Sequence, residues 1–290
     1  MIASPESPFS LTSALRFFGR SAALLALILA GLPASAADPA LYARIEFVEG
    51  EVSIFDARNE PRPARSAGVI LAGETIVTGP NGELHARTED AGFVAFRPNT
   101  RVRIDSYLAA GGKDDNVAVS LVTGALRSIT GWIGRLNPGG YRIKTANATV
   151  GIRGTDHETH YIASSPGGDP GATAPGTYDK VNAGATLLQN NAGQLLINAG
   201  QAAHAAHDGK SSPRLLDRAP PIFKPGKNEP RIESRRTELS REIETRLQDR
   251  INELRDTHDL KDLKDMKDKI DPDDARRKII EKRKRRAADK

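Results

Sequence analysis

The sequence predicts a mainly β domain followed by a charged α-helical extension. Between Ile45 and Ala206, short runs of residues alternate between apolar and polar, as the two faces of half-buried strands require. Glycine, proline and asparagine separate these runs, which is typical of turns. From about Glu233 the chain becomes dominated by charge, and apolar residues recur at helical spacing. The strands are expected to form a β-sandwich, or a β-roll or β-helix-like domain.

Composition limits both the apolar core and the chemistry available to the chain. The chain has 290 residues, of which 5% are aromatic, and its mean hydropathy is -0.45. A modest core with additional solvated material is therefore expected. The chain contains no cysteine, which excludes disulfides, thiol catalysis and cysteine-based zinc sites. Packing alone must stabilise the fold.

Residues 1–36 have the pattern of a secretory signal peptide. Arg16 and Arg20 precede an apolar run, and Ala34-Ser35-Ala36 has the small-residue form that signal peptidase accepts. The apolar run is short for a helix that must cross about 30 Å of hydrocarbon. Cleavage is therefore favoured, with an uncleaved anchor as the alternative. The predicted location is periplasmic or secreted.

Residues 37–207 are predicted to form the β domain, with about a dozen strands. Asn81-Gly82 and Arg97–Thr100 are expected to form tight turns, because their residue types favour turn conformations. The glycine- and proline-rich segment Ser164–Asp179 is predicted to be a surface loop. The stretch Thr145–Ile162 should hold a central strand pair with a bulge at its glycines.

Residues 208–231 are interpreted as a linker or a strap over the domain, because five prolines oppose both helix and sheet interiors. Residues 232–290 are predicted to form a charged helical tail. Its apolar residues draw one narrow stripe, which suits a coiled-coil seam better than a globular core. We predict that the stripe binds a protein partner or a second copy of the chain through Ile232, Leu239, Ile243, Leu247, Ile251 and Leu254.

The end of the tail is strongly basic. A last helix is expected to begin at Asp271, and it carries Lys282, Arg283, Lys284, Arg285 and Arg286. Basic clusters of this kind bind phosphates and other anions. Because export separates the chain from nucleic acid, the expected polyanions are envelope polymers or lipid headgroups. A solvated tail that aids solubility is the alternative.

The sequence contains no recognisable catalytic motif. His157 and His160 lie three positions apart, whereas the helical zinc-protease motif needs histidines four apart. The β-branched neighbours predict a strand, in which residues three apart point to opposite faces. Surface or turn histidines are therefore expected. We predict no enzyme activity, no metal site and no cofactor.

Two segments resemble the FecR domain family. Residues 71–104 contain the string G-E-T-I-V-T-G, an alternating strand pair and a P-N-T turn. Residues 145–156, TANATVGIRGTD, are similar to the most specific string of that family. The resemblance covers about residues 45–205, and its signature residues are Gly73, Thr78, Gly79, Pro98, Asn99, Gly151, Arg153, Gly154, Thr155 and Asp156.

The resemblance implies an extracytoplasmic all-β domain without catalytic residues. In the founding member, this domain is a periplasmic segment that relays a signal from an outer-membrane receptor to a sigma factor. That protein has a cytoplasmic anti-sigma region, whereas only residues 1–20 precede the apolar run here, so direct sigma-factor control is not expected. We predict an exported, non-catalytic binding and signalling module that acts through protein contacts. The alternative is a protein that binds or structures the envelope through its basic tail.

Overall fold

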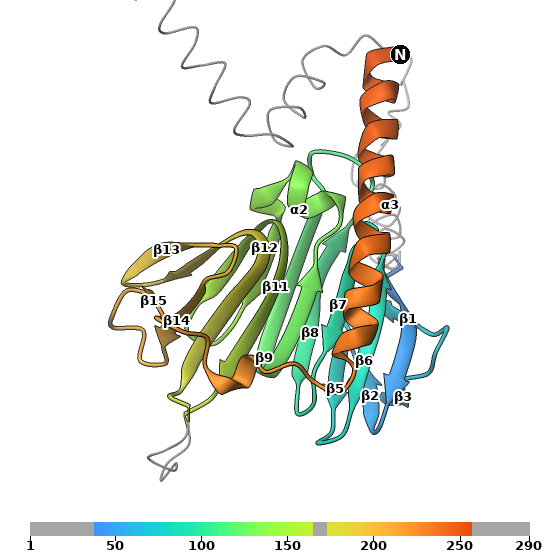
Figure 1. The fold of residues 1–290 in the computed structure, drawn as a ribbon. Helices are drawn as coiled ribbons and strands as arrows, with labels where there is room; N and C mark the ends of the chain where they lie inside the picture. Colours follow the sequence, from blue (N-terminus) through green and yellow to red (C-terminus); the bar gives the residue numbers. More distant parts are fainter. Residues whose placement is uncertain (1–37, 165–172, 257–290) are drawn as a thin grey trace, which may run out of the picture. The chain divides into compact units, whose positions relative to one another are not determined.

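The computed structural model describes residues 38–164 and 173–256, without the side chains at 250, 251 and 253–256. All elements below belong to the unit Pro39–Lys290. The prediction of a mainly β fold followed by a charged helix is confirmed: the described residues form a 15-stranded mixed sheet and a long helix (Figure 1).

The strands, in chain order, are β1 (Leu41–Glu49), β2 (Val52–Phe55), β3 (Pro61–Pro63), β4 (Val69–Leu71), β5 (Thr75–Thr78), β6 (Glu83–Thr88), β7 (Phe93–Phe96), β8 (Arg101–Leu108), β9 (Asn116–Ile129), β10 (Tyr141–Lys144), β11 (Thr149–Ile162), β12 (Gly176–Asn190), β13 (Gly193–Asn198), β14 (Ala202–Ala206) and β15 (Arg214–Leu215). The helices are α2 (Trp132–Leu136) and α3 (Glu229–Asp256), with short 3-10 turns η1 (Pro138–Gly140) and η2 (Pro221–Phe223).

Three long strands hold the sheet together. The first half of β9 pairs with β8 and, in parallel, with β10, whereas its second half pairs with β7 and β11. Strand β11 likewise changes partner from β10 to β9, and β12 changes partner from β14 to β13. Each of these strands therefore runs from one part of the sheet into another. Strands that turn such corners allow a sheet to fold over a core.

Glycines with positive φ lie where these strands change direction. Gly124, Gly154 and Gly184 have φ angles of 87°, 61° and 78°. The register of β11 against β12 shifts between Arg153 and His157, which marks a bulge. At Gly184 a Cβ atom would lie 2.2 Å from the carbonyl oxygen of Gly154. The two backbones therefore approach more closely than any side chain would allow.

One large apolar core lies inside the folded sheet. It draws residues from strands far apart in the pairing order, including Ile54 of β2, Phe96 of β7, Ile197 of β13 and Ala205 of β14. These four side chains are completely buried. A single shared core requires the sheet to fold over it, as the corner strands permit.

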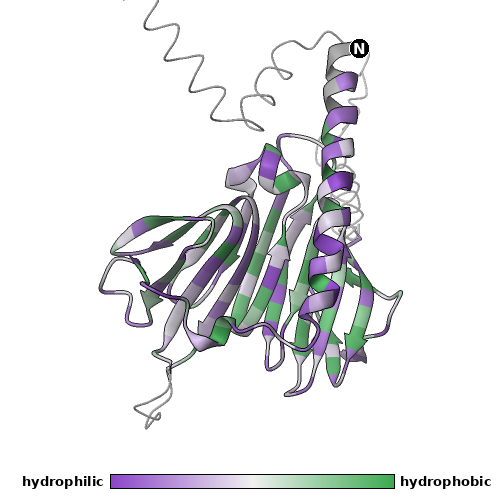
Figure 2. Ribbon diagram, viewed as in Figure 1, coloured by the Kyte–Doolittle hydropathy of each residue, from purple (hydrophilic) through white to green (hydrophobic). Residues whose placement is uncertain are grey.

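Alternation between the two strand faces holds in β8 and is absent in β7. In β8, Val102 and Ile104 are buried and Arg101 and Arg103 are exposed, as expected. All four residues of β7, Phe93–Phe96, are buried. The outward-facing half of β7 lies beneath α3, whose remaining surface is largely hydrophilic (Figures 1 and 2). A strand covered on both faces consists of continuous apolar residues.

Two element boundaries differ from the sequence prediction. Strand β12 begins at Gly176, inside the predicted loop Ser164–Asp179, because it pairs there with β11 and β14. Helix α3 begins at Glu229, inside the predicted linker. Pro230 is compatible with this start, because a first-turn residue needs no N–H donor within the helix. Glu229 also suits the positive end of the helix dipole.

The close approach at Gly184 leads to a prediction about stability. Gly184→Ala should lower the free energy of unfolding by about 3 kcal/mol or more, because it combines an unfavourable φ with a backbone clash. Gly200 is the matched control, since its φ is 83° and a Cβ there meets no atom within 4 Å. Gly200→Ala should cost about 1 kcal/mol. If urea unfolding shows that Gly184→Ala and Gly200→Ala lose equal free energy of unfolding, the β11–β12 contact at Gly184 is not tight.

Candidate functional site

The first half of α3 packs on the outer face of the sheet. Ile232 and Leu239 form one buried cluster with Phe93 and Ala95 of β7 and Ile129 of β9. Phe93 and Ala95 therefore face away from the main core and toward the helix. This contact is the reason that β7 carries no polar face.

The next turns of α3 pack on the segment between β6 and β7. Ile243 and Leu247 cluster with Ala91, and Trp132 and Leu136 of α2 lie against them. Two short apolar clusters thus follow one side of α3. They fix the helix against both the sheet and α2.

The apolar stripe is therefore occupied within the chain. Ile232, Leu239, Ile243 and Leu247 are at most 4% exposed. This placement differs from the coiled-coil seam that the spacing suggested, because a narrow stripe packs on a sheet as well as on another helix. The side chains of Ile251 and Leu254 lie outside the described residues.

Arg127 of β9 is the charged centre of the contact, and its side chain is only 3% exposed. It donates hydrogen bonds to both carboxylate oxygens of Asp156, at 2.9 and 2.6 Å. It also pairs with Glu229 and, at 2.7 Å, with Glu233, both on α3. Burial alone would lower the pKa of Arg127, but its bonds to Asp156 and the acids of α3 outweigh burial and raise it. The charged guanidinium therefore links β9, the β11 bulge and α3.

A second buried arginine, Arg97, lies directly after β7. Its Nη2 donates to Glu158 at 2.9 Å and to Glu229 at 2.7 Å. Glu229 therefore bridges both arginines. Glu158 also accepts a hydrogen bond from the His160 ring at 2.7 Å. Burial alone would raise the pKa of Glu158, but the His160 bond and the Arg97 charge together lower it to about 2.

Weaker polar contacts border the buried part of the interface. Arg235 of α3 pairs with Glu46 of β1 at 2.5 Å, and the Arg235 side chain is 30% exposed. Further along α3, the Arg246 guanidinium lies 5.4 Å from the centre of the Trp132 ring. Exposed pairs of this kind contribute little to stability, so Arg127 and Arg97 dominate the electrostatics of the contact.

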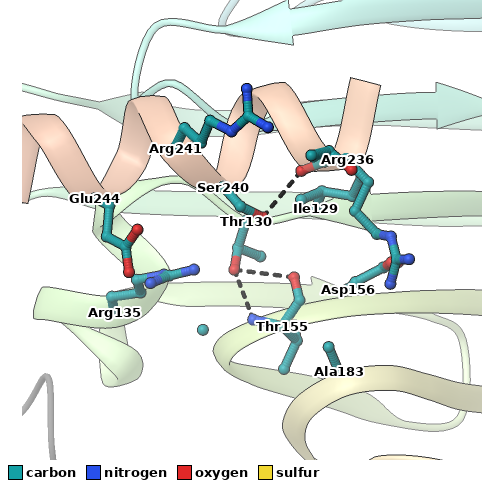
Figure 3. Close-up of a pocket in the computed structure, with 12 residues that line it drawn as sticks. Ile129, Thr130, Arg135, Thr155, Asp156, Ala183, Arg236, Ser240, Arg241 and Glu244 are labelled. Carbon is teal, nitrogen blue, oxygen red and sulfur yellow. Dashed lines mark hydrogen bonds between the residues drawn. The ribbon is translucent and has the colours of Figure 1, made fainter. Parts of the chain in front are cut away.

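A cleft of about 340 Å³ opens between α2, α3 and the β11 bulge (Figure 3). Its floor includes Thr130 and Thr155, both buried. Thr130 Oγ1 accepts the backbone N–H of Thr155 at 2.8 Å and donates to its carbonyl oxygen at 3.2 Å. Three arginines also line the cleft: Arg135 from α2, and Arg236 and Arg241 from α3. The cleft is therefore polar and rich in positive charge.

The signature residues of the family resemblance shape turns and the bulge. Gly73, Thr78, Gly79, Pro98 and Asn99 lie in or beside the turns that flank β5 and connect β7 to β8. Gly151, Arg153, Gly154, Thr155 and Asp156 lie on β11 at or near its bulge.

Individual contacts show how two of these residues act. Thr78 Oγ1 donates to the carbonyl oxygen of Arg97 at 2.6 Å and accepts the backbone N–H of Thr100 at 2.8 Å. Thr78 therefore holds the turn that positions Arg97. Asp156 accepts the hydrogen bonds of Arg127 described above. The signature thus supports both buried arginines of the interface.

The expectation of surface or turn histidines is wrong for His157, which is 0% exposed. Its Nδ1 lies 2.9 Å from Asp179, to which Thr159 and Thr186 also donate, at 2.7 and 2.6 Å. Pairing of β11 with β12 places this polar network inside the folded sheet. In the described part of the chain, no group of three or more His, Cys, Asp or Glu side chains is placed to hold a metal ion.

Some predicted features lie outside the described residues. These are the signal peptide of residues 1–36 and the basic cluster Lys282–Arg286. No helix in the described ranges is both long enough and apolar enough to cross a membrane.

Sequence reasoning missed the arginines that organise this site. Arg127 follows the apolar residues Ala125 and Leu126 in a strand-like run, which is an unusual position for an unpaired charge. Glu229 and Glu233 are four residues apart at the start of a helix and so share one face. Together these features could have indicated a buried charge and an acidic segment able to neutralise it.

The role of Arg127 can be tested by removing its charge. Arg127→Met should lower the free energy of unfolding by about 3 kcal/mol or more, because Asp156 and Glu229 would lose their buried counter-charge. Arg235→Met is the control and should cost at most about 1 kcal/mol, since that pair is partly exposed. Similar losses for both variants in urea unfolding would argue against Arg127 as the organising residue.

The lowered pKa of Glu158 gives a pH-dependent prediction. Its folded-state pKa of about 2 lies below the ordinary value of 4.5, so the ionised carboxylate stabilises the fold. That stabilisation is fully present above about pH 5 and is lost as the pH falls toward 2, with a total of about 3 kcal/mol. The difference in unfolding free energy between the natural chain and Glu158→Gln should therefore shrink over this range. A constant difference for Glu158→Gln over this range would contradict the assignment.

A family model matches part of the chain. Residues 74–166 match the FecR family model, described as FecR protein. No curated protein matches the chain. Two solved structures of a candidate anti-sigma factor from Parabacteroides distasonis ATCC 8503, at 1.65 and 2.50 Å resolution, are similar to it, with 11% and 12% identity and TM-scores of 0.36 and 0.35. Each similarity covers 49% of this chain and 57% of the other, so the chain spans little more than half the length of these proteins. The family match includes the turns around β5, β7 and β8 and the β11 bulge, and it identifies residues 74–166 as a FecR domain.

Proposed function

We propose that the chain is an exported, non-catalytic binding and signalling module whose protein contact is made by helix α3. The observation that carries this proposal is the one-sided anchoring of α3 on the FecR domain. The inner face of α3 carries the buried side chains of Ile232, Leu239, Ile243 and Leu247, whereas its opposite face is exposed and polar. A helix held in this way presents a rigid surface to a partner.

The outer face of α3 suits a reversible contact. Glu238, Arg241, Thr245 and Gln248 are all exposed on it. Charged and polar residues of both signs favour specificity and rapid association over a permanent apolar interface. A partner bound there would form a salt-sensitive, transient complex.

Arg127 provides a physical connection from α3 into the FecR domain. It contacts Glu229 and Glu233 on the helix and Asp156 at the β11 bulge. A partner that shifts α3 therefore changes the balance of charge around Asp156. Signalling requires an element, here α3, whose displacement by a partner changes the contacts at a second site.

Export of the chain rests on the pattern of residues 1–36. Basic residues, an apolar run and the small residues Ala34-Ser35-Ala36 follow one another in the order that secretion requires. The FecR match supports this proposal, because the resemblance implies an extracytoplasmic domain. The partner would then be a protein of the same compartment.

Site-specific cross-linking in the producing organism tests the proposal. A photoreactive amino acid replaces Gln248 on α3 in one strain and Gln194 on β13 in a control strain; both positions are exposed. Irradiation should yield a discrete protein adduct at position 248 and not at position 194. No adduct at 248, or the same adducts at both positions, would count against a protein contact through α3.

The same experiment addresses the alternative function. An adduct that resists protease, but is removed by enzymes that degrade envelope polymers, would favour an envelope-binding protein tethered by Lys282–Arg286. In that case, replacing these five basic residues with glutamine should abolish the adduct.

A further inference from the structure

Two buried polar atoms that lack a hydrogen-bond partner within the described residues belong to side chains lining the same cleft. They are Nε of Arg135 and Oγ1 of Thr155. The guanidinium N–H is a donor only, and the hydroxyl donates one hydrogen bond. Buried donors are nearly always hydrogen-bonded in native proteins. Two such donors without partners, both in side chains that line one cleft, therefore point to a ligand that supplies acceptor atoms there. Figure 3 shows this cleft.

The position of Arg135 is fixed by the fold. A Cβ atom at Gly154 would lie 3.1 Å from the Cγ of Arg135, so the arginine stem passes close over the bulge where this glycine has no side chain. Arg135 belongs to α2, whose Ile133 is completely buried in the main core. The stem of Arg135 is therefore held beside the floor of the cleft, and the residue is only partly buried, so its guanidinium is close to any ligand there.

The acids of the cleft do not cancel its positive charge. Both oxygens of Asp156 are bound by Arg127. Glu244 of α3 reaches toward Arg135 on the same side of the cleft (Figure 3). Burial lowers the pKa of Arg135, and the charge of Glu244 opposes this effect without overcoming it. Arg135 is thus a partly buried cation with incomplete compensation.

The two arginines of α3 complete the arrangement. Arg236 and Arg241 line the mouth of the cleft and are exposed, so they can meet an anion that arrives from solvent. Arg236 binds Glu233 through Nε at 3.0 Å, and a guanidinium has further N–H groups to offer. The cleft therefore combines exposed cations at its mouth with two floor side chains whose buried donors have no partner in the part of the chain that the structure describes.

We propose that this cleft is a phosphate-binding site. Arg135 and Thr155 would bind phosphate oxygens at the floor, and Arg236 and Arg241 would bind them at the mouth. A phosphate group suits this set better than a carboxylate, because it offers more acceptor oxygens and a charge between −1 and −2 at neutral pH. The volume of about 340 Å³ accommodates inorganic phosphate, a small phosphate ester or a lipid headgroup.

A phosphate bound there would bridge two elements of the fold. Arg135 comes from α2, whereas Arg236 and Arg241 come from α3. A ligand that binds all three favours the docked position of α3 and stabilises the folded chain. Arg241 belongs both to this site and to the proposed protein contact on the outer face of α3, whereas Arg135, Thr155 and Arg236 belong to the cleft alone.

The chain contains one tryptophan, Trp132, which provides a probe for this site. It lies three residues before Arg135 on α2 and packs against the Ile243 cluster of α3. Inorganic phosphate is titrated into the purified full chain at constant ionic strength, with chloride as the compensating anion. We expect a saturable change in Trp132 fluorescence and a rise in the unfolding temperature.

Variants decide whether the response comes from the cleft. Arg135→Gln should weaken phosphate binding about tenfold or more, since it removes a charge-assisted donor. Arg153→Gln should leave the phosphate affinity unchanged, because Arg153 is exposed on β11, the strand of Thr155, and does not line the cleft. Arg241 is exposed on α3, so Arg241→Gln should leave the fold intact and weaken phosphate binding several-fold. This second variant keeps the test valid if Arg135→Gln fails to fold.

Three results would overturn the proposal. The first is the absence of a saturable response up to about 10 mM phosphate, because a specific site should have a dissociation constant below this concentration. The second is an equal affinity in the natural chain, Arg135→Gln and Arg241→Gln. The third is equally tight binding of citrate, which would assign the cleft to carboxylates.

The source of the phosphate group can be separated in the same way. Glycerol phosphate binding without sedimentation on phosphatidylglycerol vesicles would indicate a soluble ligand. Sedimentation that Arg135→Gln weakens would indicate a lipid headgroup. Sedimentation that Arg135→Gln leaves unchanged, together with no response to soluble phosphate, would assign the charge effect to other basic residues and contradict the site.

Discussion

The buried guanidinium of Arg127 is the constraint on which the arrangement of the helix and sheet depends. A charge with 3% exposure requires partners, because removing an unpaired ion from water costs several kcal/mol. Asp156 supplies one partner from the β11 bulge, and Glu229 and Glu233 supply others from α3. Such a network contributes little net stability and strongly restricts geometry. The helix must therefore begin where its two acids reach β9.

The apolar contact alone leaves the orientation of α3 less defined. Four buried aliphatic side chains supply most of its attraction to the sheet, at about 1.5–3 kcal/mol each. A smooth apolar stripe permits sliding along the sheet, whereas Glu229 must reach both Arg127 and Arg97. Hydrophobic burial therefore drives docking, and the buried ion pairs select one register. This division of roles explains why a charge-rich helix can still pack in a defined position.

The sequence indicated each half of this contact without indicating that the halves meet. Alternating strands and the later stripe predict the β domain and the helix, because both patterns are local. The unbroken apolar run Phe93–Phe96 is a local sign of a strand covered on both faces. The bond between Arg97 and Glu229 joins residues 132 positions apart, which no periodicity reveals. Arg135 was equally hidden, since one arginine among 42 basic residues has no local mark of burial.

The β11 bulge is the point at which these elements converge. Gly154 admits the stem of Arg135, and Asp156 holds Arg127. The Thr155 hydroxyl has no hydrogen-bond partner among residues 38–164 and 173–256. Three consecutive residues thus contact α2, the cleft and the ion pair that fixes α3. A ligand in the cleft and a partner on α3 would both change the free energy of the same docked helix, so each must alter the affinity of the other by an equal factor. The bulge would then couple the two sites that we propose, because its residues contact both the cleft and the ion pair that fixes α3.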